Sequence, residues 1–203
     1  MKEFTRWSEM QQAYQTGLAE SGNAGSLGFH GSDGDVSRFI ARYRLAESFE
    51  EARFVGYGED TGVAYSDMLG FFLTWGAFEA YCRVMGMTKP NASVLDHSAI
   101  QPVFKTHELK GPLGPKARER LVEFLAKHVS DRRLATELKE ATGESEVYAI
   151  CRAMRHLFVH GTLTVHAGGT TPSTVSRASK GLREFLLEVM SEGCHGVLRG
   201  PRV

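Results

Sequence analysis

The sequence predicts an all-α protein, a helical bundle with long loops and an N-terminal helical extension. Apolar residues recur at spacings of three and four along most of the chain, as they do in amphipathic helices. Glycine follows several of these apolar runs, and proline stands at the expected first position of the last one. We interpret residues 161–171 as a loop, with a short strand as the alternative.

Composition is that of a single globular domain. The chain has 203 residues, of which 42% are hydrophobic, enough for a sizeable core. Lys plus Arg and Asp plus Glu both number 24, so the formal net charge is zero. Such a balance excludes a broadly basic surface for non-specific nucleic-acid binding, although it is compatible with a local basic site.

We find neither a membrane-spanning segment nor an export signal in the sequence pattern. The most apolar stretch, residues 68–78, is well short of the ~20 residues that a membrane span requires. The N-terminal residues carry acids and glutamines where an export signal has an apolar run. Cys82, Cys151 and Cys194 show no C-x-x-C spacing, and their odd number favours a reduced protein. We therefore expect a cytoplasmic protein without a membrane partner.

Residues 1–60 form the predicted N-terminal extension, which we expect to pack on the same domain as the rest. Apolar side chains at helical spacing predict a first helix from Phe4 that ends near Gly22. Five glycines over residues 21–37 predict a loop, and a second helix follows over residues 36–54.

Residues 61–203 form the predicted main domain, which opens with a long helix over residues 66–84 that stops at Gly86. Gly70 and Gly76 inside this helix each cost up to about 1 kcal/mol relative to Ala. They therefore predict close packing against a neighbouring helix. Four of the six prolines fall after this helix, over residues 88–115, and predict an irregular connection with one short helix.

The remaining helices follow in the second half of the chain. They are predicted over residues 116–129, 131–141 and 146–159. Ser130 is the expected N-cap of the second of these. A last helix begins with Thr171 as N-cap and Pro172 at its first position, and runs to about Glu192.

The stretch "CRAMRHLFVHG", residues 151–161, carries two arginines and two histidines in an otherwise apolar helix. Arg152, His156 and His160 repeat every four residues on one side of a helical wheel, and Arg155 lies roughly 140° from His160. Apolar side chains fill an arc of about 120° on the other side; they are Val147, Ile150, Cys151, Met154, Leu157 and Phe158. Because the stretch contains no carboxylate, we interpret the polar face as a functional surface, with simple exposure to water as the alternative.

A zinc site is another alternative for this face. His156 and His160 are spaced i, i+4 as in helical zinc sites, and His166 follows six residues later. No acidic residue stands beside them, however, and the arginines would repel a cation. We therefore expect neither a metal nor another cofactor.

The string from Arg155 to His160, followed by Gly161, resembles the R-x4-H signature of the HEPN superfamily. In that family a polar residue follows the arginine, as His156 does here, and the motif ends a helix late in an all-α bundle. Residues 74–86 are similar to the central-helix segment of several HEPN branches. The resemblance covers residues 60–192.

The resemblance implies a homodimer in which two R-x4-H motifs meet at one cleft. Catalytic members are metal-independent ribonucleases, often toxins or antiviral effectors, and an antitoxin or regulatory protein is a typical partner. Histidine can transfer protons near neutral pH, and arginine binds phosphate oxygens bidentately. We therefore expect His160 to transfer the proton and Arg155 to bind the scissile phosphate, with His156 and Arg152 as auxiliary phosphate- or RNA-binding residues.

Some HEPN members have lost catalysis, and they provide the alternative function. The chain would then be a helical module that binds a nucleotide, RNA or a partner protein. Zero net charge and the lack of an obvious second basic cluster in the sequence favour this alternative.

Overall fold

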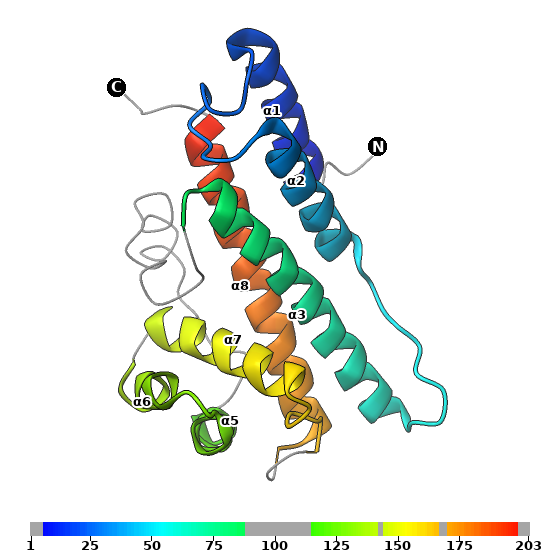
Figure 1. Ribbon diagram of the computed structural model, residues 1–203. Helices are drawn as coiled ribbons and strands as arrows, with labels where there is room; N and C mark the ends of the chain where they lie inside the picture. The colour runs from blue at the N-terminus through cyan, green and yellow to red at the C-terminus, as the bar shows by residue number, and fades with distance from the viewer. Residues whose placement is uncertain (1–5, 88–114, 142–143, 167–169, 199–203) are drawn as a thin grey trace. The chain divides into compact units, whose positions relative to one another are not determined.

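The computed structural model describes residues 6–87, 115–141, 144–166 and 170–198, and these residues form α-helices and connecting loops without a strand (Figure 1). The helices are α1 (Arg6–Ser21), α2 (Asp33–Ser48), α3 (Glu59–Val84), α5 (Pro115–His128), α6 (Arg132–Glu140), α7 (Glu144–Val159) and α8 (Pro172–Leu198). The predicted all-α fold class is confirmed. The short helix predicted within residues 88–115 falls almost wholly outside the described residues.

The chain divides into two compact units. Unit 1 comprises Met1–Phe49, Leu73–His107 and Glu184–Val203, and unit 2 comprises Glu50–Phe72 and Glu108–Arg183. Helices α3 and α8 therefore contribute residues to both units, and residues 1–49 share unit 1 with later segments of the chain.

In unit 1, α1 and α2 lie side by side (Figure 1). Tyr14, Phe39 and Tyr43 fill its core, and the Tyr43 hydroxyl donates a hydrogen bond of 3.2 Å to the carbonyl oxygen of Leu187 on α8. Helix α2 begins at Asp33, three residues before the predicted start. Ser32 and Asp35 form a capping box there, in which each side chain binds the backbone N–H of the other residue.

The connection from α2 to α3 differs from the prediction. Helix α2 ends at Ser48 rather than near residue 54, and α3 begins at Glu59 rather than at residue 66. Phe54 packs on Tyr57 and Tyr65, with ring centroids 6.5 Å and 5.8 Å away. This aromatic cluster in unit 2 holds the connection in a non-helical conformation that local periodicity does not reveal.

One of the two glycines that we predicted to permit close helix packing does not have this role. A Cβ atom added at Gly76 on α3 would meet nothing within 4 Å, so the close packing predicted there is wrong. Gly193 on α8 has this role in unit 1, because a Cβ atom there would overlap the buried ring of Tyr81, whose Cζ would lie 2.9 Å away.

In unit 2, helices α5, α6 and α7 pack against one another (Figure 1). Their shared core includes Leu121, Leu134 and Leu157. An ion pair between Arg118 on α5 and the buried Glu146 on α7 also links two of these helices. At the start of α8, the Thr171 hydroxyl accepts a hydrogen bond of 3.3 Å from the Thr174 N–H, which confirms the predicted N-cap.

All three cysteines are buried and free. Burial raises the pKa of the Cys82 thiol to about 12 and the pKa values of Cys151 and Cys194 further. These thiols are therefore protonated and unreactive at neutral pH. Within the part of the chain that is described, no helix is both long and apolar enough to cross a membrane.

Candidate functional site

The R-x4-H motif lies at the C-terminal end of α7, where a glycine fixes the backbone. Gly161 has φ +71, in the left-handed region that favours glycine. Its N–H bonds the Phe158 carbonyl at 2.9 Å, and the Thr162 N–H bonds the Leu157 carbonyl at 2.8 Å. This pair of bonds is the Schellman motif, so His160 is the C-cap residue and stands one position beyond the helix.

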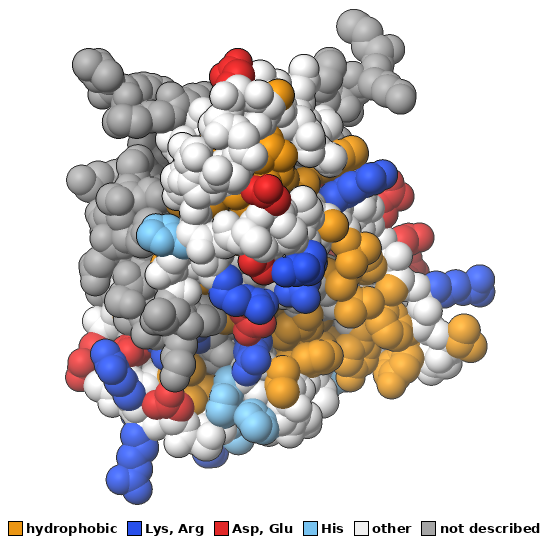
Figure 2. Space-filling view, turned by 45° about the horizontal axis from the view of Figure 1, so that its top comes forward, with side chains coloured by type: hydrophobic (Ala, Val, Ile, Leu, Met, Phe, Trp, Pro, Cys, Tyr) orange, Lys and Arg blue, Asp and Glu red, His pale blue; other side chains and the backbone are white. Residues whose placement is uncertain are grey.

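His156 and His160 form a pair at the protein surface. Their ring centroids lie 4.4 Å apart, with the ring planes at 55°. The His160 side chain is exposed and that of His156 is half-buried. Figure 2 shows histidine side chains next to one another on the surface in view. The spacing of four residues predicted on one face of the helix therefore brings two proton-transferring groups into contact.

Ser130 joins this pair, although the sequence analysis assigned it another role. Asp131, not Ser130, caps α6, because the Asp131 carboxylate accepts hydrogen bonds from the N–H groups of Arg133 and Leu134. The predicted N-cap is thus wrong by one residue. The Ser130 hydroxyl lies instead 3.0 Å from Nε2 of His156. A serine before a helix predicts a cap from the local sequence alone. The contact of Ser130 with His156 depends instead on the packing of α6 on α7.

The environment of His156 favours its neutral form. Burial lowers its pKa most, and the positive charges of His160 and Arg155 lower it further, whereas the carboxylate of Asp131 opposes them. The charge of Arg155 therefore acts on His156. Arg155 and His160 do not share a face on an ideal helix. Arg155 nevertheless lies close enough to His156 to lower the pKa of that residue.

Arg152 is held by an acidic residue from another helix. Its Nη1 atom lies 2.5 Å from Oε2 of Glu137 on α6, and the Arg152 side chain is only 15% exposed. Its guanidinium also lies 5.9 Å from the ring centre of Tyr148. The stretch 151–161 contains no carboxylate of its own, and Glu137 on α6 supplies the one that neutralises the charge of Arg152.

The apolar side of α7 follows the prediction except at its two ends, and at the first of these Val147 is only half-buried. Ile150, Cys151, Met154 and Leu157 are buried as expected. Phe158 is 38% exposed, because it stacks on the ring of Phe72 at 3.9 Å instead of entering the core. Its assignment to the core is therefore wrong.

Exposed apolar side chains gather in unit 2. Val159, next to Phe158, is 60% exposed. Of the six large apolar residues that are exposed among the described residues, five belong to unit 2; they are Val55, Tyr57, Val63, Phe158 and Val159. Figure 2 shows broad areas of hydrophobic side chains on the surface in view. The histidine pair is thus followed directly by two apolar side chains that a partner could cover.

Among the described residues, His166 does not complete a zinc site with His156 and His160. Its Nε2 atom is 3.2 Å from the Thr61 hydroxyl. In the described ranges, no group of three or more His, Cys, Asp or Glu side chains is arranged to hold a metal ion.

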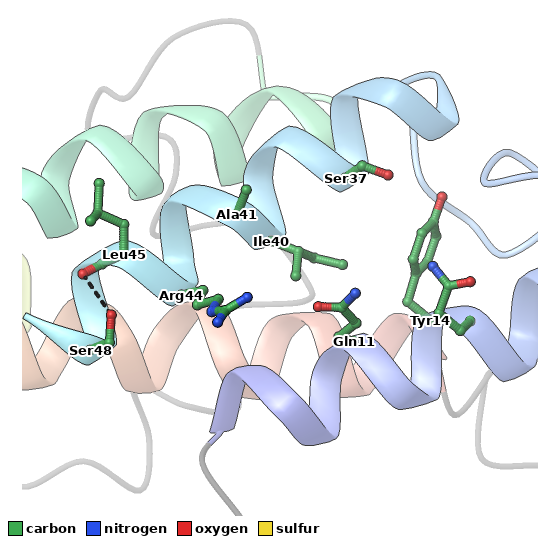
Figure 3. Close-up of a pocket in the computed structure, with 9 residues that line it drawn as sticks. Gln11, Tyr14, Ser37, Ile40, Ala41, Arg44, Leu45 and Ser48 are labelled. Atoms are coloured by element: carbon green, nitrogen blue, oxygen red, sulfur yellow. Dashed lines mark hydrogen bonds between the residues drawn. The ribbon is translucent and has the colours of Figure 1, made fainter.

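A separate groove of about 480 Å³ runs between α1 and α2 in unit 1 (Figure 3). Gln11, Tyr14 and Ile40 line it together with Arg44, whose guanidinium stacks over Trp7 at 4.4 Å. No histidine, carboxylate or cysteine is among its described lining residues. Arg44 is the one Lys, Arg, Asp or Glu among the lining residues that the structure describes.

Comparisons with family models, with curated proteins and with solved structures give no match for this chain. The HEPN resemblance therefore depends on the motif from Arg155 to Gly161 and on its position at the end of a helix in an all-α fold.

Proposed function

We propose that the protein is a metal-independent endoribonuclease of HEPN type that acts as a homodimer, as a toxin or an antiviral effector. The observation that carries the proposal is the contact of His156 with His160 at the exposed end of α7, within the field of Arg155. This arrangement combines groups that transfer protons at neutral pH with a permanent positive charge.

The reaction needs a base, an acid and a cation. His160 removes the proton from the ribose 2′-hydroxyl, and the 2′-oxygen attacks the adjacent phosphorus. The bond from phosphorus to the 5′-oxygen breaks, and His160 of the partner subunit protonates the leaving oxygen. Arg155 binds the non-bridging oxygens and stabilises the charge of the phosphorane. The products are a 2′,3′-cyclic phosphate and a 5′-hydroxyl.

The auxiliary residues support this geometry. His156 is neutral at pH 7 and is held by Ser130, so it orients the ring of His160 and can donate or accept a hydrogen bond at a phosphate. Arg152, through Glu137, holds α6 against α7. Its proposed contribution to RNA affinity is therefore indirect, because α6 positions Ser130.

A second copy of the chain supplies the second histidine. Phe158 and Val159 precede His160 and present apolar surface that dimerisation would remove from water. The net charge of zero produces no overall repulsion between two copies. A stable interface buries about 800 Å² on each partner, so residues beyond Phe158 and Val159 would also take part.

The test is cleavage of RNA by the purified full chain in the presence of EDTA. We expect fragments that end in 2′,3′-cyclic phosphate, and we expect His160→Ala to abolish cleavage. Arg155→Ala should reduce it strongly, and Arg155→Lys should restore it only in part because lysine cannot bind phosphate bidentately. His166→Ala and Arg177→Ala are the matched controls, since both side chains are exposed and lie outside the motif. Cleavage that survives both His160→Ala and Arg155→Ala would refute the proposal.

The alternative is a non-catalytic helical module that binds a nucleotide, RNA or a partner protein. Neutralisation of Arg152 by Glu137 favours it, because the motif then displays less positive charge than the sequence suggests. Expression in a host cell separates the two functions. A nuclease should arrest growth, the His160→Ala/Arg155→Ala variant should not, and an antitoxin or regulatory protein would relieve the arrest. Growth that is equal with both proteins favours the binding module.

A further inference from the structure

Three arginines of unit 1 surround a small hollow between α2 and α3. Arg38 and Arg42 lie one turn apart on α2, Arg83 comes from the last turn of α3, and the hollow measures about 50 Å³. Ala80 and Val84, both buried, also line it. Figure 2 shows basic side chains gathered on the surface in view. We call these three residues the arginine cluster.

The arginine cluster retains a net positive charge. Asp35, the carboxylate among the lining residues, binds Arg38 at 2.6 Å. Nε of Arg83 donates to the backbone carbonyl of Glu79 at 3.3 Å, a contact that leaves its two Nη groups for another acceptor. The Arg42 side chain forms no hydrogen bond or ion pair with the described residues. Three guanidinium groups and one carboxylate leave a charge of +2 around the hollow.

Helix stability explains only part of this cluster, in which Asp35 and Arg38 pair at i and i+3 on α2. Arg83 is favourable at the C-terminal end of α3, where the helix dipole favours cations. Arg38 and Arg42, however, are like charges at i and i+4, an arrangement that destabilises a helix. An anion between them and Arg83 would remove this repulsion.

We propose that the arginine cluster binds a backbone phosphate of single-stranded RNA. Guanidinium groups pair with phosphate oxygens in charge-assisted, often bidentate hydrogen bonds. Sites that enclose a whole small molecule have volumes of about 300–1,000 Å³, and this hollow is far smaller. It therefore fits one charged group that is carried on a longer chain. The inference rests on the proposed function for RNA as the ligand, and it places a further RNA contact in unit 1.

An acidic protein segment is the competing ligand, and the surface of unit 1 disfavours it. Protein interfaces have an apolar centre. Among the described residues of unit 1, Leu45 is the single large apolar side chain that is exposed, and it does not line this hollow. A phosphodiester chain needs no such apolar contact, because its affinity comes from phosphate neutralisation.

The experiment measures binding of a fluorescently labelled single-stranded RNA to the His160→Ala protein in EDTA, so that the RNA stays intact. The test variant carries Arg38→Gln, Arg42→Gln and Arg83→Gln in addition. The control variant carries Arg44→Gln, Arg133→Gln and Arg177→Gln, which changes the net charge equally at exposed positions outside the cluster. Thermal melting verifies that both triple variants fold.

We expect the test variant to bind RNA on the order of tenfold more weakly, as for the loss of a charged hydrogen bond. The slope of log K against log salt should decrease in magnitude by about 0.7 for each phosphate no longer neutralised. The control variant should match the parent protein. Equal weakening by both triple variants would overturn the proposal, and so would polyglutamate binding as tight as that of RNA.

Cleavage assays with His160 present separate this inference from the proposed function. The test substitutions should raise KM for a long RNA and leave cleavage of a dinucleotide unchanged, because a dinucleotide has no second phosphate to reach the cluster. An unchanged KM would overturn the inference while the nuclease function stands. RNA binding that depends on the cluster, in a protein that cleaves no RNA, would support the inference while the nuclease function fails.

Discussion

The imidazole rings of His156 and His160 lie 4.4 Å apart at the end of α7. One ring belongs to the helix and the other to its C-cap residue, so the Schellman motif at Gly161 determines how they meet. Burial lowers the pKa of His156, and the positive charges of His160 and Arg155 lower it further.

The pKa of His156 should lie below its usual value of about 6.5. Replacing His160 or Arg155 with Gln should raise this pKa, because each change removes a neighbouring positive charge, and Asp131→Asn should lower it. Titration of the imidazole resonances by NMR measures all four values. An unchanged pKa in both the His160→Gln and Arg155→Gln proteins would contradict the proposed coupling.

The same shift makes the protein less stable in acid. The folded state disfavours the protonated form of His156, so the unfolded state binds more protons once the pH falls below about 6.5. Stability should therefore decrease as the pH falls from about 6.5 through the pKa of the folded state, and His156→Gln should reduce this decrease. Urea unfolding at several pH values provides the measurement, with His166→Gln as the control.

Ser130→Ala should lower the rate of RNA cleavage by about two- to tenfold, the effect of losing one neutral hydrogen bond of about 0.5–1.5 kcal/mol. The ring of His156 would lose the partner that orients it, while folding should hardly change because Ser130 is exposed and does not cap α6. Ser130→Thr keeps the hydroxyl and should restore the rate. A Ser130→Ala protein with the parent rate would show that this contact has no functional role.

Arg152→Ala should destabilise the protein by about 1–3 kcal/mol, because it leaves the carboxylate of Glu137 partly buried without its partner. Arg133 also contacts Glu137, at 3.3 Å, but its side chain is 83% exposed, so Arg133→Ala should cost at most about 0.5 kcal/mol. A double-mutant cycle of Arg152 and Glu137 in urea isolates the coupling energy. Weaker RNA binding by Arg152→Ala at unchanged stability would instead favour a direct contact with RNA.

Gly193→Ala should destabilise the protein by about 1–3 kcal/mol, because the added methyl group overlaps the buried Tyr81 ring. The Tyr81 hydroxyl has no hydrogen-bond partner among the described residues, so Tyr81→Phe should recover much of this loss. Gly76→Ala is the matched control, and it should stabilise the protein by up to about 1 kcal/mol, because its Cβ atom meets open space in a helix. Equal effects of the two glycine substitutions would contradict this packing.

Val159→Asp should convert the proposed dimer to a monomer, because it places a charge in the apolar surface next to His160. The rate of RNA cleavage should decrease together with the dimer fraction if the second histidine comes from the partner copy. Leu45→Asp is the control, since Leu45 is 55% exposed but belongs to unit 1. Light scattering coupled to size-exclusion chromatography distinguishes the two states, and a Val159→Asp protein that remains dimeric would exclude this surface as the interface.

Local signals in the sequence predicted the helices well. The helix stop at Gly161, the cap at Thr171 and the buried positions of α7 through Leu157 all follow from backbone preferences and from apolar periodicity, which act over one or two turns. The C-terminal end of α2 and the start of α3 were misplaced, because an aromatic cluster formed by residues of the connection and of α3 decides them.

The sequence by itself thus determined the fold class and the contact of His156 with His160, since both depend on residues at helical spacing. Only the tertiary structure decided that Glu137 neutralises Arg152, that Ser130 holds His156, and that Gly193 rather than Gly76 permits close packing. It also joined Arg83 to Arg38 and Arg42 in a basic cluster that the sequence does not display. The physical reason is the same in each case: these partners lie on different helices, and helical periodicity carries no information about which helices pack together.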